Sequence, residues 1–190
     1  MVTWIIIGAV VVLLLFVVVG AYNKLVKLDQ EANQAFADID VQLKQRQDLI
    51  PNLVETVKGY AAHEAGTLEA VIAARNKAAS AGSVEERVQA ENLLTGALGR
   101  LFALAEAYPD LKANQNFLGL QGELADLENK LAAARRFFNN AVSEFNAVRR
   151  AFPTILFAPM VGYGSDRTFF DVGEDARAAM DAAPPQVKFG

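Results

Sequence analysis

The residue pair with the most suggestive chemistry is a histidine followed directly by a glutamate. His63 and Glu64 match the start of a zinc-protease signature, in which a second histidine follows the first by four residues on one helix face. Position 67 is Thr67, and the chain contains a single histidine, so the second ligand is missing. We therefore expect His63 to be structural or solvated, and we expect no metal site.

Acidic residues offer general acid–base chemistry as an alternative. An enzyme built on this chain would use Asp38, Asp48 or His63. Carboxylates at Asp38 and Asp40 lie two residues apart, a spacing that does not bring side chains together on a helix. The absence of cysteine excludes thiolate zinc sites, iron–sulfur clusters and cysteine nucleophiles. We expect no catalytic residues, no cofactor and no enzymatic activity.

Charges also alternate in sign just before the first proline of the chain. The residues are Asp38, Asp40, Lys44, Arg46 and Asp48, and they precede Pro51. This alternation predicts a network of ion pairs at the turn between the first two predicted helices. A binding site at the same place is the alternative.

The elements that would position any site begin with a strongly apolar segment. Of the first 22 residues, 19 are hydrophobic, whereas the whole chain of 190 residues is 53% hydrophobic. Residues 2–21 match the roughly 20 residues that a helix needs to cross a hydrocarbon core of about 30 Å. The alternative is a cleaved signal peptide, but no basic residue precedes the segment and it exceeds a usual signal core. Residues 1–23 are therefore predicted to be a transmembrane anchor.

Four residues are predicted to anchor this segment at the two membrane surfaces. Trp4 and Tyr22 lie near its ends, where aromatic rings prefer the headgroup level. Lys24 and Lys27 follow it, and the positive-inside rule then puts the N-terminus outside and the body in the cytoplasm. The net charge of −4 gives no support for nucleic-acid binding. Membrane lipid is the expected partner, and nucleic acid is not.

The remainder of the chain predicts an all-α fold. One helix continues from the span to about Asp48, a second begins near Pro51, and a third begins after a capping box of Ser83 and Glu86. A fourth runs from about Asp110 to Arg150. We expect these helices to form a long antiparallel four-helix bundle over residues 24–152.

The fourth predicted helix carries the most regular apolar pattern in the chain. Its apolar residues alternate three- and four-residue steps, the period of coiled-coil-like bundle packing. They are Phe117, Leu120, Leu124, Leu127, Leu131, Ala134, Phe138, Ala141, Phe145, Val148 and Phe152. This side of the helix is expected to face the bundle core.

The predicted C-terminal tail, residues 153–190, is proline-containing and irregular. Residues 151–163 carry no charged side chain but are too few to span a bilayer as a helix. In one interpretation, Ile155, Leu156 and Phe157 fold back onto the bundle. In the other, an exposed patch meets a neighbouring subunit or the membrane surface. The candidate interface residues are Ile155, Leu156, Phe157, Met160 and Tyr163.

Several segments of the chain resemble the LemA family of membrane proteins. The resemblance rests on residues 39–64 (IDVQLKQRQDLIPNLVETVKGYAAHE), 105–114 (AEAYPDLKAN), 134–139 (ARRFFN) and 185–189 (PQVKF). It also includes Asn116-Phe117 and residues 128–130, and it covers nearly the whole chain after the anchor. Phe36, Gln45 and Phe138 depart from the family pattern but keep size and helical character.

The resemblance implies a bacterial inner-membrane protein with an external N-terminus and a cytoplasmic helical bundle. The family has no established enzymatic activity, so it offers no catalytic residues to carry over. It includes a magnetosome-membrane member, and its genes often lie near those of membrane metalloproteases. We therefore hypothesise a non-enzymatic, membrane-anchored scaffold that forms a homo-oligomer by lateral self-association. The alternative is an adaptor for a membrane protease, such as a membrane metalloprotease, or for a transporter.

Overall fold

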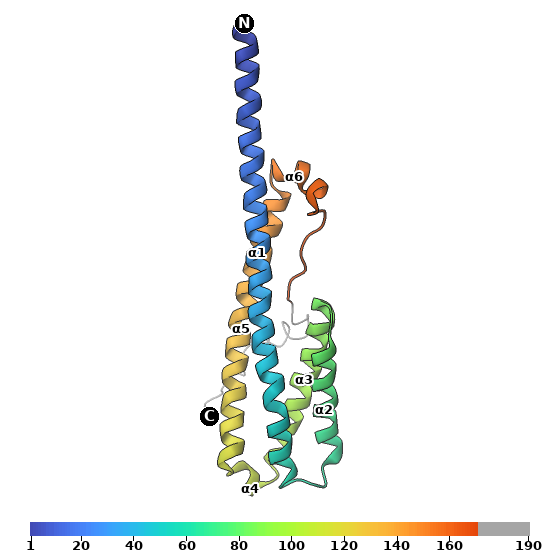
Figure 1. Ribbon diagram of the computed structural model, residues 1–190. Helices are drawn as coiled ribbons and strands as arrows, with labels where there is room; N and C mark the ends of the chain where they lie inside the picture. The colour runs from blue at the N-terminus through green and yellow to red at the C-terminus, as the bar shows by residue number, and fades with distance from the viewer. Residues whose placement is uncertain (171–190) are drawn as a thin grey trace, which may run out of the picture. The chain divides into compact units, whose positions relative to one another are not determined.

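The computed structural model describes residues 1–170, and within them the chain is helical without any strand (Figure 1). The elements are α1 (Val2–Lys58), α2 (Ala65–Ser80), α3 (Val84–Ala105), α4 (Pro109–Lys112), α5 (Gln115–Arg150), α6 (Thr154–Phe157) and the short 3₁₀ helix η1 (Ala158–Val161). The predicted all-α class is confirmed. Of the predicted tail, residues 171–190 lie outside the described residues.

The chain divides into two compact units. The first unit consists of Met1–Leu43 and Leu127–Phe169, and the second contains Lys44–Asp126. The helices α1 and α5 each contribute residues to both units.

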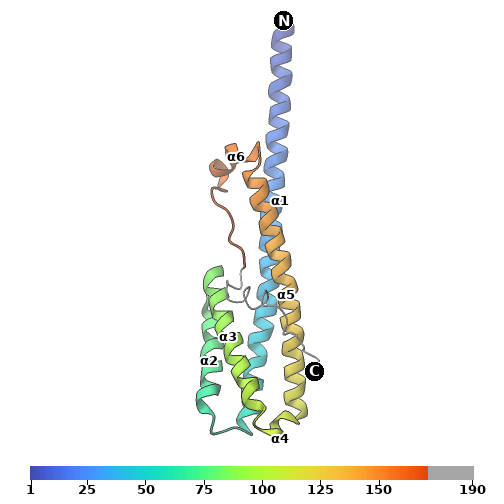
Figure 2. The same cartoon turned by 180° about the vertical axis from the view of Figure 1, so that it is seen from behind.

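The second unit contains helical segments that alternate in direction around a common core. In Figures 1 and 2, the end of α1 is followed by α2, α3 and the start of α5, each reversing the direction of the one before. Fully buried side chains from these segments form the core, among them Leu53, Val57, Val71, Leu94 and Leu101. The short helix α4 adds the buried Leu111. The core is thus built from apolar stripes of several helices.

The helix α3 begins with the predicted capping box. The Ser83 hydroxyl accepts a hydrogen bond from the Glu86 backbone N–H at 3.1 Å. The Glu86 carboxylate accepts from the backbone N–H groups of Gly82, at 3.0 Å, and Ser83, at 3.2 Å. These backbone hydrogen bonds favour the charged form and lower the pKa of Glu86. The cap satisfies N–H groups that have no partner within the helix.

The prediction that a helix begins near Pro51 is wrong, because α1 continues through Pro51 to Lys58. Proline has no N–H to donate, so the Gln47 carbonyl four residues earlier loses its partner within the helix. Arg75 of α2 supplies a replacement, since its Nε donates to the Gln47 carbonyl at 3.3 Å. The helix instead ends before residues 59–64, which form the turn to α2.

The helix α5 buries the predicted apolar seam. Its buried members are Phe117, Leu124, Leu127, Leu131, Phe138, Ala141 and Phe145, while Leu120, Ala134 and Val148 are half-buried. Two details differ from the prediction. The helix begins at Gln115, because Pro109 starts the separate helix α4, and Phe152 lies beyond the end of α5 and is exposed.

The first unit is built on α1 and α5, which lie side by side in both ribbon views (Figures 1 and 2). The rings of Phe36 and Phe138 pack at a centroid distance of 5.5 Å. Farther towards the N-terminus of α1, Leu25 and Leu28 form a small core with Phe145 of α5 and Ala158 of η1. The contact of Ala158 with Leu25, Leu28 and Phe145 holds α6 and η1 against the helix pair.

Candidate functional site

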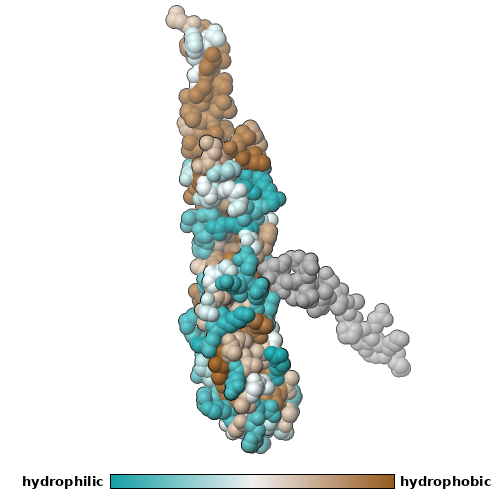
Figure 3. Space-filling model, turned by 90° about the vertical axis from the view of Figure 1, so that its right-hand side faces the viewer, coloured by the Kyte–Doolittle hydropathy of each residue, from teal (hydrophilic) through white to brown (hydrophobic). Residues whose placement is uncertain are grey.

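The N-terminal part of α1 is long and apolar enough to cross a membrane, by length and composition. Its most apolar window of 18 residues has a mean hydropathy of 3.2, and none of that window is buried. Figure 3 shows the segment as a brown, hydrophobic column. The predicted anchors Trp4, Tyr22, Lys24 and Lys27 are all exposed on α1.

The residues 152–161 carry a group of exposed apolar side chains, which we call the α6–η1 patch. It consists of Phe152, Ile155, Leu156, Met160 and Val161. Leu156 is 67% exposed and Met160 is 85% exposed. Of the five predicted interface residues, Ile155, Leu156 and Met160 therefore lie in the patch.

The other two predicted interface residues, Phe157 and Tyr163, are half-buried. The Tyr163 ring packs on the Phe145 ring at a centroid distance of 5.7 Å and an interplanar angle of 67°. Burial, together with the negative charge of Asp29, raises the pKa of Tyr163. Of the three residues in the fold-back interpretation, Phe157 is half-buried, whereas Ile155 and Leu156 are exposed and contradict it.

A glycine turns the chain back towards the helix pair after η1. Gly162 has a φ of +94°, a left-handed conformation that side chains with a Cβ adopt at a cost. The backbone N–H groups of Gly162 and Tyr163 both donate to the Ala158 carbonyl. This closed turn directs residues 163–167 along α5.

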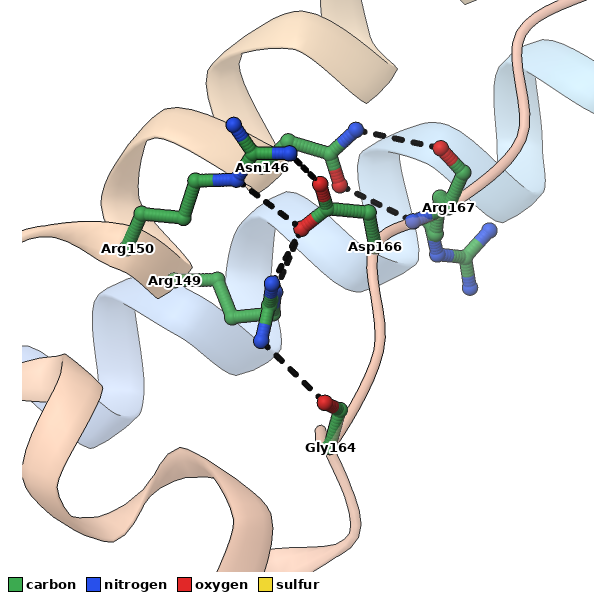
Figure 4. Close-up of polar contacts among 6 residues, drawn as sticks. All are labelled: Asn146, Arg149, Arg150, Gly164, Asp166 and Arg167. Atoms are coloured by element: carbon green, nitrogen blue, oxygen red, sulfur yellow. Dashed lines mark hydrogen bonds and ion pairs between the residues drawn. The ribbon is translucent and has the colours of Figure 1, made fainter.

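Asp166 fastens the returning segment to the end of α5 (Figure 4). Its carboxylate accepts a hydrogen bond from Arg149 Nε at 2.8 Å, and Nη2 of Arg149 also contacts it. Arg150 forms a second ion pair with the same carboxylate. Arg149 Nη1 also donates to the Gly164 carbonyl at 3.3 Å. One carboxylate thus joins two consecutive arginines to the segment.

Arg167 fastens the segment to both long helices. The Asn146 side chain of α5 accepts from the Arg167 N–H at 2.9 Å and donates to the Arg167 carbonyl at 3.0 Å (Figure 4). The Arg167 guanidinium donates to Asp29 of α1 at 2.6 Å and to Asn33 at 2.7 Å. It also lies over the Phe145 ring, 5.5 Å from its centroid. These charge-assisted contacts fix the segment against α1 and α5.

An open pocket of about 480 Å³ lies beside this network. Its lining includes Ser143, Asn146, Arg150, Asp166 and Phe169. Asp166 is engaged by two guanidinium groups, and no histidine lines the pocket to activate Ser143. These ion pairs hold the Asp166 carboxylate in the attachment of the returning segment to α5.

The three residues considered for catalysis are each on the surface. Asp38, Asp48 and His63 are all exposed, and Asp48 forms an ion pair with Lys44 at 2.6 Å. Within the described part of the chain, no group of three or more metal-ligating side chains is placed to hold an ion. The ion-pair network predicted at a turn before Pro51 is present only in part. Lys44 pairs with Asp48, whereas Arg46 is buried in the second unit and pairs with Glu91 of α3.

Arg46 forms a buried ion pair that the sequence analysis missed. Its Nη1 lies 3.1 Å from Oε2 of Glu91, and the side chains are 3% and 1% exposed. Arg46 Nη2 donates to the Thr95 hydroxyl at 2.9 Å, and the Gln47 amide lies 3.4 Å from the second oxygen of Glu91.

A sequence signal for this pair exists. Arg46 falls between the buried Leu43 and Ile50, and Glu91 falls between Val88 and Leu94. Both charges therefore occupy core positions of an apolar stripe with three- and four-residue steps. Opposite charges at two such positions favour a buried pair, because a single buried charge would be costly.

Comparison with known proteins gives one family and several relatives. The LemA family matches residues 35–189. Magnetosome protein MamQ of Magnetospirillum gryphiswaldense is 23% identical over 168 residues, with 75% of this chain and 62% of the relative covered. Protein LemA of Metamycoplasma hominis is 29% identical over 137 residues, with coverages of 70% and 61%. Magnetosome protein MamQ 2 of Paramagnetospirillum magneticum is 22% identical over 168 residues, with 75% of this chain and 62% of the relative covered. The chain therefore spans about three-fifths of the length of these relatives.

Proposed function

The chain belongs to the LemA family, and from this premise we propose that it is a non-enzymatic, single-pass scaffold of the bacterial inner membrane. Copies associate side by side through their helical bodies, which lie in the cytoplasm. The observation that carries this proposal is the exposed apolar segment of α1, which continues as the same helix into the first unit. A continuous helix of this kind holds the rest of the first unit at a fixed distance from the membrane.

Confinement to one membrane favours lateral association for a physical reason. Copies held in the same plane and orientation meet at a raised effective concentration, so weak contacts between them add up. Among the described residues outside the apolar segment and the α6–η1 patch, Phe137 of α5 is the most exposed large apolar side chain, at 59%. Burying a phenylalanine contributes about 1.5–3 kcal/mol. We propose that the face of α5 carrying Phe137 takes part in the contact.

The proposed orientation can be tested with single cysteines, because the chain contains none. Ala132 is exposed on α5, in the helical body. Val2 is exposed at the N-terminal end of the apolar segment of α1. We expect a membrane-impermeant maleimide to label Val2→Cys in intact cells but Ala132→Cys only after the inner membrane is opened. Labelling of Ala132→Cys before that step would overturn the cytoplasmic placement.

Self-association can be tested by light scattering on the full-length protein in detergent. We expect a mass above that of the monomer, and Phe137→Glu should reduce the oligomer fraction several-fold, because a carboxylate replaces the apolar contact. Ala132→Glu is the matched control. It adds the same charge to the same helix five residues away, on a different face, and should leave the oligomer fraction unchanged.

The outcomes separate the two parts of the proposal. If the parent protein is monomeric in detergent and single-cysteine variants form no cross-linked dimers in vesicles, the self-associating scaffold is wrong. If the parent associates and Phe137→Glu does so equally well, association stands and the Phe137 face is excluded.

A further inference from the structure

The α6–η1 patch lies in an uncharged stretch of the chain, and its apolar side chains are exposed. Residues 151–164 contain no charged side chain. The patch side chains are exposed although the segment around them is folded, with Thr154 and Ala158 buried. Exposed apolar side chains that lie together mark an interaction surface more often than isolated ones do.

The patch lies close to the level at which the apolar segment of α1 ends. Ala158 of η1 packs with Leu25 and Leu28. The apolar segment ends at residue 21, so Leu25 follows it by four residues, which is about 6 Å along a helix, and Leu28 by about 10 Å. Each headgroup layer of a bilayer is roughly 5–8 Å thick. With the segment across the hydrocarbon core, Ala158 would lie at or just beneath the headgroups.

The hydropathy of the surface is consistent with a position of the patch at the headgroups. Figure 3 shows brown atoms beside the base of the N-terminal column, above a surface that is mainly teal. Figures 1 and 2 place α6 beside α1 next to the part of the helix that leads into the apolar segment. The two apolar surfaces are therefore neighbours within one unit.

The charges beside the patch suit a lipid surface. Lys24, Lys27 and Arg150 are exposed. Lys24 and Lys27 are sequence neighbours of Leu25 and Leu28, and Arg150 ends α5 two residues before Phe152. Lys27 also pairs with Glu31, and Arg150 with Asp166. The nearby acids are engaged, Asp29 by Arg167 and Asp166 by Arg149 and Arg150. Exposed cations next to an apolar surface are typical of segments that bind anionic leaflets.

We propose that the α6–η1 patch inserts into the headgroup region of the membrane that α1 crosses, as a second contact of the same unit with lipid. The inference rests on the proposed anchoring by α1. A lipid surface fits better than a second copy of the chain, because a stable protein interface takes about 20–30 residues a side. The patch supplies five apolar side chains, and lipid requires no complementary shape.

Two contacts with the membrane fix the orientation of the first unit. A single helix can tilt and rotate in a bilayer. The patch limits the tilt, because one side of α1 must stay at headgroup depth. The network of Asp166 and Arg167 makes this possible, since it holds the segment after η1 rigidly against α5 and α1. All copies then hold α5 at the same depth and tilt relative to the membrane.

The test uses full-length protein in vesicles of phosphatidylcholine and phosphatidylglycerol that carry a nitroxide-labelled lipid. Met160→Cys is labelled with an environment-sensitive fluorophore, and quenching by the nitroxide reports contact with lipid. Gln34→Cys is the control outside the membrane, since exposed Gln34 lies 13 residues, about 20 Å along the helix, beyond residue 21. Val12→Cys is the control within the span. We expect Met160→Cys to be quenched several-fold more than Gln34→Cys.

Each result has a distinct meaning. If Val12→Cys is quenched and Met160→Cys behaves like Gln34→Cys, the lipid contact of the patch is wrong while the anchoring holds. If Val12→Cys is not quenched, the anchoring itself is wrong. If the Met160→Cys fluorophore shifts to the blue without quenching, and does so only at high protein-to-lipid ratios, a second copy covers the patch and the proposal is overturned.

A charge substitution within the patch gives an independent check. Leu156→Glu, introduced with the Met160→Cys probe, should reduce quenching several-fold, because a carboxylate is costly to bring into the interface and is repelled by phosphatidylglycerol. Thr168→Glu places the same charge on an exposed position outside the patch and should leave the quenching unchanged. Equal quenching in both variants would contradict insertion of α6.

Discussion

Glu91→Ala is expected to lower the free energy of unfolding by about 3–5 kcal/mol, because breaking a buried ion pair leaves a charge in the interior without its counter-ion. Arg46 would stay among the core helices of the second unit with its hydrogen bond to Thr95 but without the carboxylate. The measurement is thermal or urea unfolding of the full-length protein in detergent, followed by helical circular dichroism. The single tryptophan, Trp4, lies in the apolar segment and would not report on this unit.

A double substitution separates the cost of an unpaired charge from the value of the pair. Arg46→Met with Glu91→Leu removes both charges and keeps apolar volume. Such replacements are often neutral or stabilising, so we expect the double variant to be about as stable as the parent. A double variant as unstable as Glu91→Ala would show that the pair itself holds α1 against α3, and would contradict this reasoning.

Phe145→Ala is expected to destabilise the protein by about 3–5 kcal/mol, the usual range for removing a buried phenylalanine ring. Phe145 is 1% exposed and packs with Leu25, Leu28 and Ala158. The Tyr163 ring and the Arg167 guanidinium also lie on it. Its loss would therefore loosen the attachment of η1 as well as the contact of α5 with α1. The same unfolding measurement gives the free energy.

The local effect of Phe145→Ala can be followed by limited proteolysis of the reconstituted protein. We expect faster cleavage within residues 152–163 in Phe145→Ala than in the parent. Phe145→Leu keeps most of the apolar volume and is expected to cost clearly less. Unchanged cleavage in Phe145→Ala would mean that the polar network of Asp166 and Arg167 holds the segment without the ring.

Regular spacing made the long helices predictable. The seam of α5 repeats at three- and four-residue steps, and seven of its eleven members are buried and three half-buried. The capping box of Ser83 and Glu86 is a short-range pattern whose partners lie three residues apart, so sequence alone was sufficient. In both cases the interacting groups are set by local helical geometry.

The prediction that a helix begins near Pro51 is wrong because a distant residue compensates for the hydrogen bond that the proline removes. The cost of proline within a helix is local, but Arg75 lies 28 residues beyond Gln47 and supplies the missing donor from another helix. The apolar stripe did indicate a continuous helix, because the helical spacing of its residues continues across the proline. These residues are Leu43, Ile50, Leu53 and Val57. A helix can pass through proline where tertiary contacts satisfy the freed carbonyl.

The sequence by itself determined the apolar segment, the helical class, the seam of α5 and the family, because composition and local periodicity express each of these directly. Only the tertiary structure decided that Arg46 and Glu91 pair in a core, and that the uncharged stretch after α5 divides into a buried and an exposed part. The reason is physical. Whether a charged or apolar side chain is buried depends on which distant helix packs against it, here α3 on Arg46 and α1 on Ala158.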